Sequence, residues 1–209
     1  MSDLGCIHRS VAAERPDSPT VLLLHGTGGD ENDLIPLAQD VAPGAALLTV
    51  RGKVLENGMP RFFRRFAEGV FDIEDLKVRT DELARFVEGA RREYAIAGPL
   101  FALGYSNGAN IASTLMLTRP GVLAGGVLLR AMPTMQIEEK PDLAGVPVLL
   151  AAGRRDPIVR VEQSLALQEM FEACGAELSL HWHEGGHELG ADDVAVASRW
   201  LGVAMNSRS

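Results

Sequence analysis

The feature that most constrains the fold of this chain is a series of short apolar segments, each four to eight residues long and almost continuously hydrophobic. They are Val21–Leu24, Ala46–Val50, Leu100–Leu103, Val122–Leu129 and Val146–Ala152. Strands buried on both faces of a parallel sheet have this composition, because helices cover both faces. We therefore expect a mostly parallel sheet inside the protein.

Segments with a helical period of apolar residues separate these runs. They lie around Leu34–Val41, Leu76–Ala90, Ile111–Thr118 and Leu167–Phe171, and a last helix is expected from Asp192 to about Val203. A weaker strand is expected at Leu178–Trp182. Strands that alternate with helices predict an α/β fold with helices on both faces of the sheet. Without an internal repeat or linker, residues 1–209 are expected to form one domain of this kind.

Composition excludes several classes of protein. The net charge of −8 argues against nucleic-acid binding, which requires a basic surface. No stretch approaches the roughly 18 apolar residues of a membrane span. The start of the chain, Met1 to Cys6, has neither a basic nor an apolar region of the secretory type. Two cysteines, Cys6 and Cys174, are too few for a disulfide framework. These features predict a reduced, cytoplasmic protein.

The motif Gly104-Tyr105-Ser106-Asn107-Gly108 has the pattern G-x-S-x-G and lies between an apolar run and a helical segment. A nucleophile elbow requires this strand–turn–helix setting, in which a strained turn presents the serine at the end of the strand. Ser106 is therefore the candidate nucleophile. The alternative is a glycine-rich turn without a catalytic role.

A second glycine-rich turn, His25-Gly26-Thr27-Gly28-Gly29, follows the first buried strand. An oxyanion hole needs backbone N–H groups from such a loop and from the residue after the nucleophile. The candidate donors are Thr27 and Asn107. His25 is interpreted as a residue that orders the loop by hydrogen bonding, and a role as catalytic base is the alternative. A phosphate-binding loop is disfavoured, because Glu31 stands where a third glycine is needed. A glycine turn without any ligand remains the other alternative.

The candidate base is His187, which follows Gly185-Gly186 and precedes the last helix. A loop at this place can carry an imidazole over the elbow. Two alternatives remain open: a solvated loop histidine, or a three-histidine zinc site formed with His181 and His183.

The candidate acid is Asp156, in the loop after the strand Val146–Ala152. In this type of active site the acid follows a strand that lies between the serine and the histidine in the chain. Asp192 and Asp193 come after His187, so they break this order. The alternative for Asp156 is a solvated loop carboxylate.

The segment Arg51–Phe71 contains three glycines and a proline, and we expect a long loop of about 20 residues there. Phe62 and Phe63 offer apolar surface to an acyl or aryl group, so they are the candidate substrate-binding residues. Alternatively, the two rings attach the loop to the core.

With Ser106, Asp156 and His187 assigned, the sequence resembles the α/β-hydrolase superfamily, and within it the carboxylesterase/phospholipase family of acyl-protein thioesterases and small bacterial carboxylesterases. The resemblance extends from about Thr20 to Leu201 and rests on LLLHGTGGDENDL, GYSNGA, the loop ending in Asp156-Pro157, and GGHEL. The segment RGKVLENGMPRFFRR is similar to a bacterial branch associated with hydroquinone and quinone resistance. The family elbow commonly has Gln where this chain has Asn107.

The resemblance implies an enzyme without a large lid, cofactor or metal. The expected function is a serine carboxylesterase that hydrolyses short acyl or aryl esters through an acyl-enzyme. Thioesterase or lysophospholipase activity at the same site, a non-catalytic binding protein on this fold, and a metal-dependent hydrolase are the alternatives. The expected partner is a small-molecule ester, with no nucleic acid and no membrane span, in a monomer or homodimer.

Overall fold

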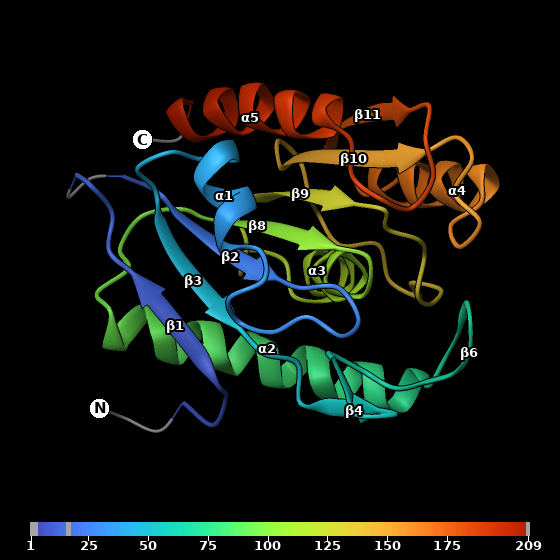
Figure 1. Ribbon diagram of the computed structural model, residues 1–209, viewed down its shortest axis with the longest axis horizontal. Coiled ribbons are helices and arrows are strands. Elements are labelled where there is room, and N and C mark those ends of the chain that lie inside the picture. The colour runs from blue at the N-terminus through green and yellow to red at the C-terminus, as the bar shows by residue number, and fades with distance from the viewer. Residues whose placement is uncertain (1–3, 16–17, 208–209) are drawn as a thin grey trace.

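The computed structural model describes residues 4–15 and 18–207. The prediction about the start of the chain therefore lies partly outside the described residues, because it includes Met1 to Asp3. Within the described part, seven strands form one sheet in the order β1-β3-β2-β8-β9-β10-β11 (Figure 1). They are β1 (His8–Val11), β2 (Thr20–Leu24), β3 (Ala46–Val50), β8 (Leu100–Tyr105), β9 (Gly125–Leu129), β10 (Pro147–Gly153) and β11 (Glu177–His183). Only the edge pair β1–β3 among these neighbours is antiparallel.

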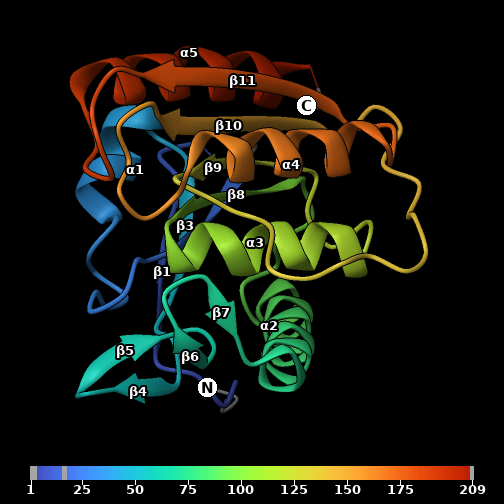
Figure 2. The same ribbon diagram turned by 90° about the vertical axis from the view of Figure 1, so that its right-hand side faces the viewer.

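Helices cover both faces of this sheet (Figures 1 and 2). One face carries α1 (Ile35–Val41) and α5 (Ala191–Asn206), and the other carries α2 (Ile73–Glu93), α3 (Asn107–Thr118) and α4 (Val161–Glu172). Successive residues of a strand point to opposite faces, so Val21 and Leu23 pack in the first layer and Leu22 and Leu24 in the second. The predicted α/β fold with a mostly parallel sheet is confirmed.

The long helix α2 shows why its sequence forms a helix. Asp72 caps its N-terminus and accepts a hydrogen bond from the Asp75 backbone N–H at 3.1 Å. Acidic residues occupy the first turn and arginines the last, which complements the helix dipole. Its apolar residues, including Leu76 and Leu83, are buried against the core.

The segment Arg51–Phe71 differs from the expected long loop. It folds into two β-hairpins, β4 (Val54–Glu56) with β5 (Met59–Arg61) and β6 (Arg65–Ala67) with β7 (Val70–Phe71). Asn57 and Gly58 form the first turn with φ of 52° and 81°, values typical of the two-residue hairpin turn that Asn-Gly favours. An ion pair of 2.9 Å between Arg65 and Glu56 joins the two hairpins.

The arrowheads of the parallel strands point to one side of the molecule (Figure 1). Ser106 follows β8, Asp156 follows β10 and His187 follows β11, so all three lie at the carboxyl edge of the sheet. Ligands of open α/β sheets bind at this edge. The fold therefore places the candidate active site there.

Candidate active site

Ser106 sits in a sharp turn between β8 and α3. Its backbone has φ of 51° and ψ of −113°, an uncommon conformation for a residue with a side chain. The backbone packs too closely for side chains on either side of it. A Cβ at Gly108 would lie 1.9 Å from the Leu24 carbonyl oxygen, and one at Gly104 would lie 2.7 Å from the Ala109 Cα. Glycines are thus required around the strained serine, as a nucleophile elbow demands.

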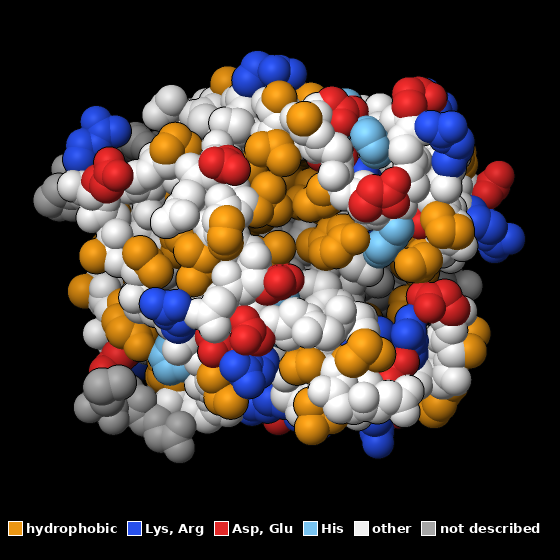
Figure 3. Space-filling model, viewed as in Figure 1, with side chains coloured by type: hydrophobic (Ala, Val, Ile, Leu, Met, Phe, Trp, Pro, Cys, Tyr) orange, Lys and Arg blue, Asp and Glu red, His pale blue; other side chains and the backbone are white. Residues whose placement is uncertain are grey.

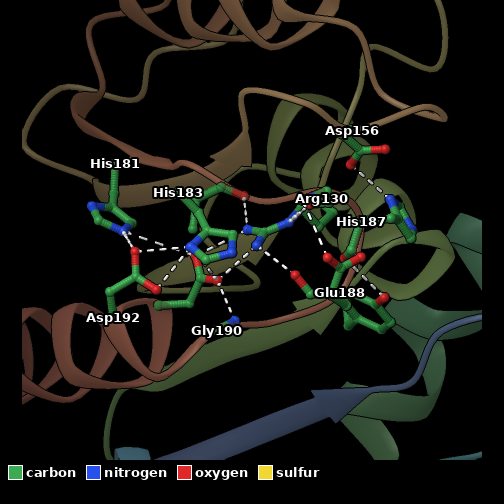
Figure 4. Close-up of polar contacts among 12 residues, drawn as sticks. Arg130, Asp156, His181, His183, His187, Glu188, Gly190 and Asp192 are labelled. Atoms are coloured by element: carbon green, nitrogen blue, oxygen red, sulfur yellow. Dashed lines mark hydrogen bonds and ion pairs between the residues drawn. The ribbon is translucent and has the colours of Figure 1, made fainter.

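The side chains of Ser106, His187 and Asp156 form a continuous hydrogen-bonded row. His187 Nε2 lies 2.9 Å from Ser106 Oγ, and His187 Nδ1 lies 2.8 Å from Asp156 Oδ2. Figure 4 shows the His187 ring directed toward Asp156. A carboxylate only accepts hydrogen bonds, so Nδ1 carries the proton and Nε2 is free to accept one from the serine hydroxyl. A general base must lie within hydrogen-bond distance of its nucleophile, and the 2.9 Å between Nε2 and Oγ meets this requirement.

The Asp156 carboxylate is fully buried yet well supported. Its side chain has 0% exposure. Its Oδ1 accepts hydrogen bonds from the backbone N–H groups of Ile158 at 2.8 Å and Val159 at 3.0 Å. The loop after β10 therefore holds the carboxylate so that Oδ2 alone faces the histidine, and the solvated alternative for Asp156 does not fit.

The loop after β2 packs directly on the elbow. A Cβ at Gly26 would lie 2.7 Å from the Tyr105 ring, so the chain segments of Thr27 and Asn107 approach each other closely. The Thr27 hydroxyl accepts a 2.6 Å hydrogen bond from Arg61, and the Asn107 side-chain oxygen accepts one of 2.7 Å from the Phe62 backbone N–H. Both candidate oxyanion residues therefore form hydrogen bonds with the segment Arg51–Phe71. That their backbone N–H groups stabilise an oxyanion stays a prediction.

The His25 ring contacts the loop after β2 and the segment Arg51–Phe71. Its Nε2 accepts a hydrogen bond of 3.0 Å from the Gly52 backbone N–H, so its Nδ1 donates to the Gly26 carbonyl at 2.6 Å. Burial lowers the pKa of His25 below its usual value, which keeps the ring neutral and preserves these two bonds at neutral pH. The contacts agree with the interpretation of His25 as an ordering residue.

Phe62 and Phe63 are core residues in the structure. Only 4% of Phe62 and none of Phe63 is exposed. The Phe62 ring packs on His25 with ring centroids 4.8 Å apart, and Phe63 meets Phe71 edge to face at 5.3 Å. This burial corrects the expectation that the two rings offer free apolar surface to substrate. The burial favours the alternative, in which the two rings attach the segment Arg51–Phe71 to the core.

We expect Phe63→Ala to lower the free energy of unfolding by about 3–5 kcal/mol, because it empties a fully buried site. Urea denaturation measures this loss. Phe66→Ala is the control, since Phe66 is 75% exposed, and it should change stability by less than about 0.5 kcal/mol. A stable Phe63→Ala variant with a kcat/KM reduced 10–100-fold would instead support contact with substrate.

The three C-terminal histidines do not converge on one point. His181 and His183 face Asp192, whereas His187 faces Asp156 (Figure 4). A three-histidine zinc site is therefore not formed. In the part of the chain that the structure describes, one group has ligand atoms close enough for a metal ion, His183 with Asp192 and Asp193. Its Asp193 carboxylate is already paired with Arg130 at 2.6 Å, which leaves it poorly suited to a cation.

Sequence reasoning missed two residues near the site, the half-buried Tyr105 and the fully buried Arg130. Arg130 ends the apolar run of β9 at the same edge of the sheet and is 0% exposed. A charged residue directly after a buried strand was the available signal for Arg130.

The face of the molecule drawn in Figure 3 has acidic and basic side chains interspersed, and no continuous basic patch is visible on it.

A strained serine after a parallel strand, with a histidine and a carboxylate after later strands, defines the α/β-hydrolase class. The chain is 47% identical over 186 residues to "Putative hydrolase MhqD" of Bacillus subtilis, covering 88% of this chain and 93% of that protein. No protein-family model matches the chain. On the strength of this relative and the structures below, the chain belongs to the phospholipase/carboxylesterase family of α/β-hydrolases.

Solved structures agree with this assignment. The carboxylesterase of Bacillus cereus superposes with a TM-score of 0.92 at 45% identity, covering 94% of this chain and 93% of that one. A carboxylesterase from Mesorhizobium loti gives 0.91 at 33% identity and covers 97% of both chains. Arabidopsis thaliana SOBER1 shares the fold at 18% identity with a TM-score of 0.76, over 90% of this chain and 99% of that one. None of the described helices has the length and apolarity to cross a membrane.

Proposed function

We propose that this protein is a serine carboxylesterase that hydrolyses short acyl or aryl esters through an acyl-enzyme. The observation that carries the proposal is the row from Ser106 Oγ through His187 to Asp156, with hydrogen bonds of 2.9 and 2.8 Å. A serine hydroxyl is a weak nucleophile until a base accepts its proton, and this row supplies that base. Relatives described as carboxylesterases support the same reaction class.

The reaction proceeds in two halves. His187 Nε2 takes the Ser106 proton while Oγ attacks the ester carbonyl carbon, and the N–H groups of Thr27 and Asn107 stabilise the oxyanion. The imidazolium returns its proton to the alcohol oxygen as the C–O bond breaks, which leaves an acyl-enzyme. His187 then activates a water molecule that releases the acid and restores Ser106. Asp156 holds the imidazole tautomer and stabilises its cation throughout.

The surroundings of the serine support a small, uncovered substrate site. The connection from β9 to β10 spans residues 130–146 and contains no helix, so no helical lid is inserted there. Met59 is 41% exposed, and its sulfur would lie 3.7 Å from a Cβ at Gly28. Met59 therefore offers apolar surface beside the candidate oxyanion loop, which suits a short acyl or aryl group.

We also propose that residues 1–209 form one domain, which acts on a small-molecule ester in the cytoplasm as a monomer or homodimer.

No step of the proposed mechanism uses a metal or cofactor. EDTA is therefore expected to leave activity unchanged, and a strong loss would favour the metal-dependent alternative.

A p-nitrophenyl ester series from acetate to dodecanoate, run beside an acyl thioester and a lysophospholipid, tests the proposal. We expect the highest kcat/KM on acetate or butyrate, with a fall as the acyl chain outgrows the site. A higher kcat/KM on the thioester or the lysophospholipid would establish the alternative activity at the same site. Absence of turnover on every substrate would favour a non-catalytic binding protein.

A further inference from the structure

Three consecutive backbone carbonyls around His187 each accept a hydrogen bond from one of two side chains, the buried Arg130 and the half-buried Tyr105. Arg130 Nε donates to Gly186 at 3.0 Å, the Tyr105 hydroxyl donates to His187 at 3.1 Å, and Arg130 Nη2 donates to Glu188 at 2.8 Å. Figure 4 shows Arg130 between the His187 loop and the start of α5. Exposed loops normally solvate their carbonyls with water, so fixed side-chain donors on three in a row are unusual.

Every N–H group of the Arg130 guanidinium has a protein acceptor. Besides the two loop carbonyls, it forms a bidentate pair with Asp193 at 3.0 and 2.6 Å and donates to the Ala151 carbonyl at 3.3 Å. Both charged side chains are inaccessible to solvent, at 0% for Arg130 and 1% for Asp193. A buried charge pair is costly unless its geometry and hydrogen bonds are complete, and here they are.

The backbone of Arg130 is also in an uncommon conformation, with φ of 58°. The residue follows β9, which lies between the strand of the nucleophile and the strand of the acid. Its partner Asp193 is in the first turn of α5 and accepts a further hydrogen bond from the Gly190 N–H at 2.9 Å. One side chain therefore joins β9, β10, the histidine loop and α5.

We propose that the Arg130–Asp193 pair positions His187, holding its loop so that the imidazole bridges Ser106 and Asp156. This inference rests on the proposed function and adds a positioning residue outside the serine row. Misplacement of a catalytic group by about 1 Å costs on the order of 100-fold in rate. Tyr105 assists, because its hydroxyl donates to the His187 carbonyl at 3.1 Å. Burial raises the pKa of the Tyr105 phenol further above neutral pH.

Two variants test the proposal. Arg130→Lys keeps the charge opposite Asp193 but has a compact ammonium that does not span both loop carbonyls. The paired exchange Arg130→Met with Asp193→Leu removes both charges, and such replacements commonly preserve stability. Asp192→Asn is the matched control, since Asp192 is the exposed neighbour of Asp193 and contacts His183.

For both test variants we expect a cooperative melt, a kcat on p-nitrophenyl acetate about 100-fold lower, and a KM within about threefold of the original. Amide hydrogen exchange of residues 184–190 should become faster, while Asp192→Asn matches the unmodified protein in every readout. A folded Arg130→Lys variant with unchanged kcat and unchanged exchange would overturn the proposal. Loss of the cooperative melt in both variants would also overturn the proposal, because the Arg130–Asp193 pair would then be required for folding rather than for the position of His187.

The exchange measurement separates this inference from the proposed function. If the unmodified protein hydrolyses no ester but the loop still exchanges faster in Arg130→Lys, the esterase function fails and the positioning of the loop stands. If the protein is an active esterase and the variants match it in kcat and exchange, the positioning inference alone fails.

Discussion

Ser106→Ala is expected to lower kcat by about 10⁶-fold, the loss seen when a nucleophile that works with a histidine is removed. The structure gives the physical reason. Ser106 Oγ is the atom 2.9 Å from His187 Nε2, and alanine leaves the imidazole with no proton to accept. KM does not report the loss of the nucleophile, so the assay is the single-turnover release of p-nitrophenol.

Ser113→Ala is the matched control for this substitution. Ser113 is a buried serine inside α3, the helix that follows Ser106, and its hydroxyl donates to the Asn110 carbonyl at 2.8 Å. Its removal should leave kcat within about twofold. Equal activity of Ser106→Ala and the control would exclude the serine mechanism.

Asp156→Asn is expected to reduce kcat on the order of 10⁴-fold with little change of fold, because it inverts the histidine tautomer. Oδ1 of Asp156 accepts two backbone N–H groups, so the oxygen of an asparagine amide must remain there. The NH₂ group then takes the place of Oδ2 and faces His187 Nδ1 as a donor. The imidazole responds by protonating Nε2, which can no longer accept the serine proton.

The control for this substitution is Asp192→Asn, which alters a carboxylate 47% exposed on the far side of the histidine loop. We expect its kcat to remain within about twofold of the unmodified value. If Asp192→Asn caused the larger loss and Asp156→Asn the smaller, the acid would have been assigned to the wrong loop.

The central part of the fold was predictable because its strands are buried on both faces. Runs such as Leu100–Leu103 have no solvent side, so hydrophobicity alone identifies them. The elbow was predictable for a different reason: Gly104 and Gly108 are imposed by backbone contacts too short for any side chain. Residues at the ends of such strands meet at one edge, which is why Asp156 and His187 could be placed from chain order.

Other features escaped prediction for identifiable physical reasons. The edge strand β1 has the sequence His8-Arg9-Ser10-Val11, and its partial exposure removes the apolar pattern by which strands are recognised. The first hairpin was missed although Asn57-Gly58 is a strong turn signal, because three-residue strands carry almost no periodicity. Arg130 is held by carbonyls and Asp193 from distant parts of the chain, which only the tertiary structure brings together.

Mass spectrometry of the protein after reaction with a fluorophosphonate shows whether Ser106 is the nucleophile, because an activated serine hydroxyl attacks the phosphorus atom of this reagent and displaces fluoride. We expect one adduct per chain, located by peptide mapping on Ser106, and no adduct in the Ser106→Ala variant. An adduct on any other residue, or no adduct on the folded protein, would show that Ser106 is not an activated nucleophile.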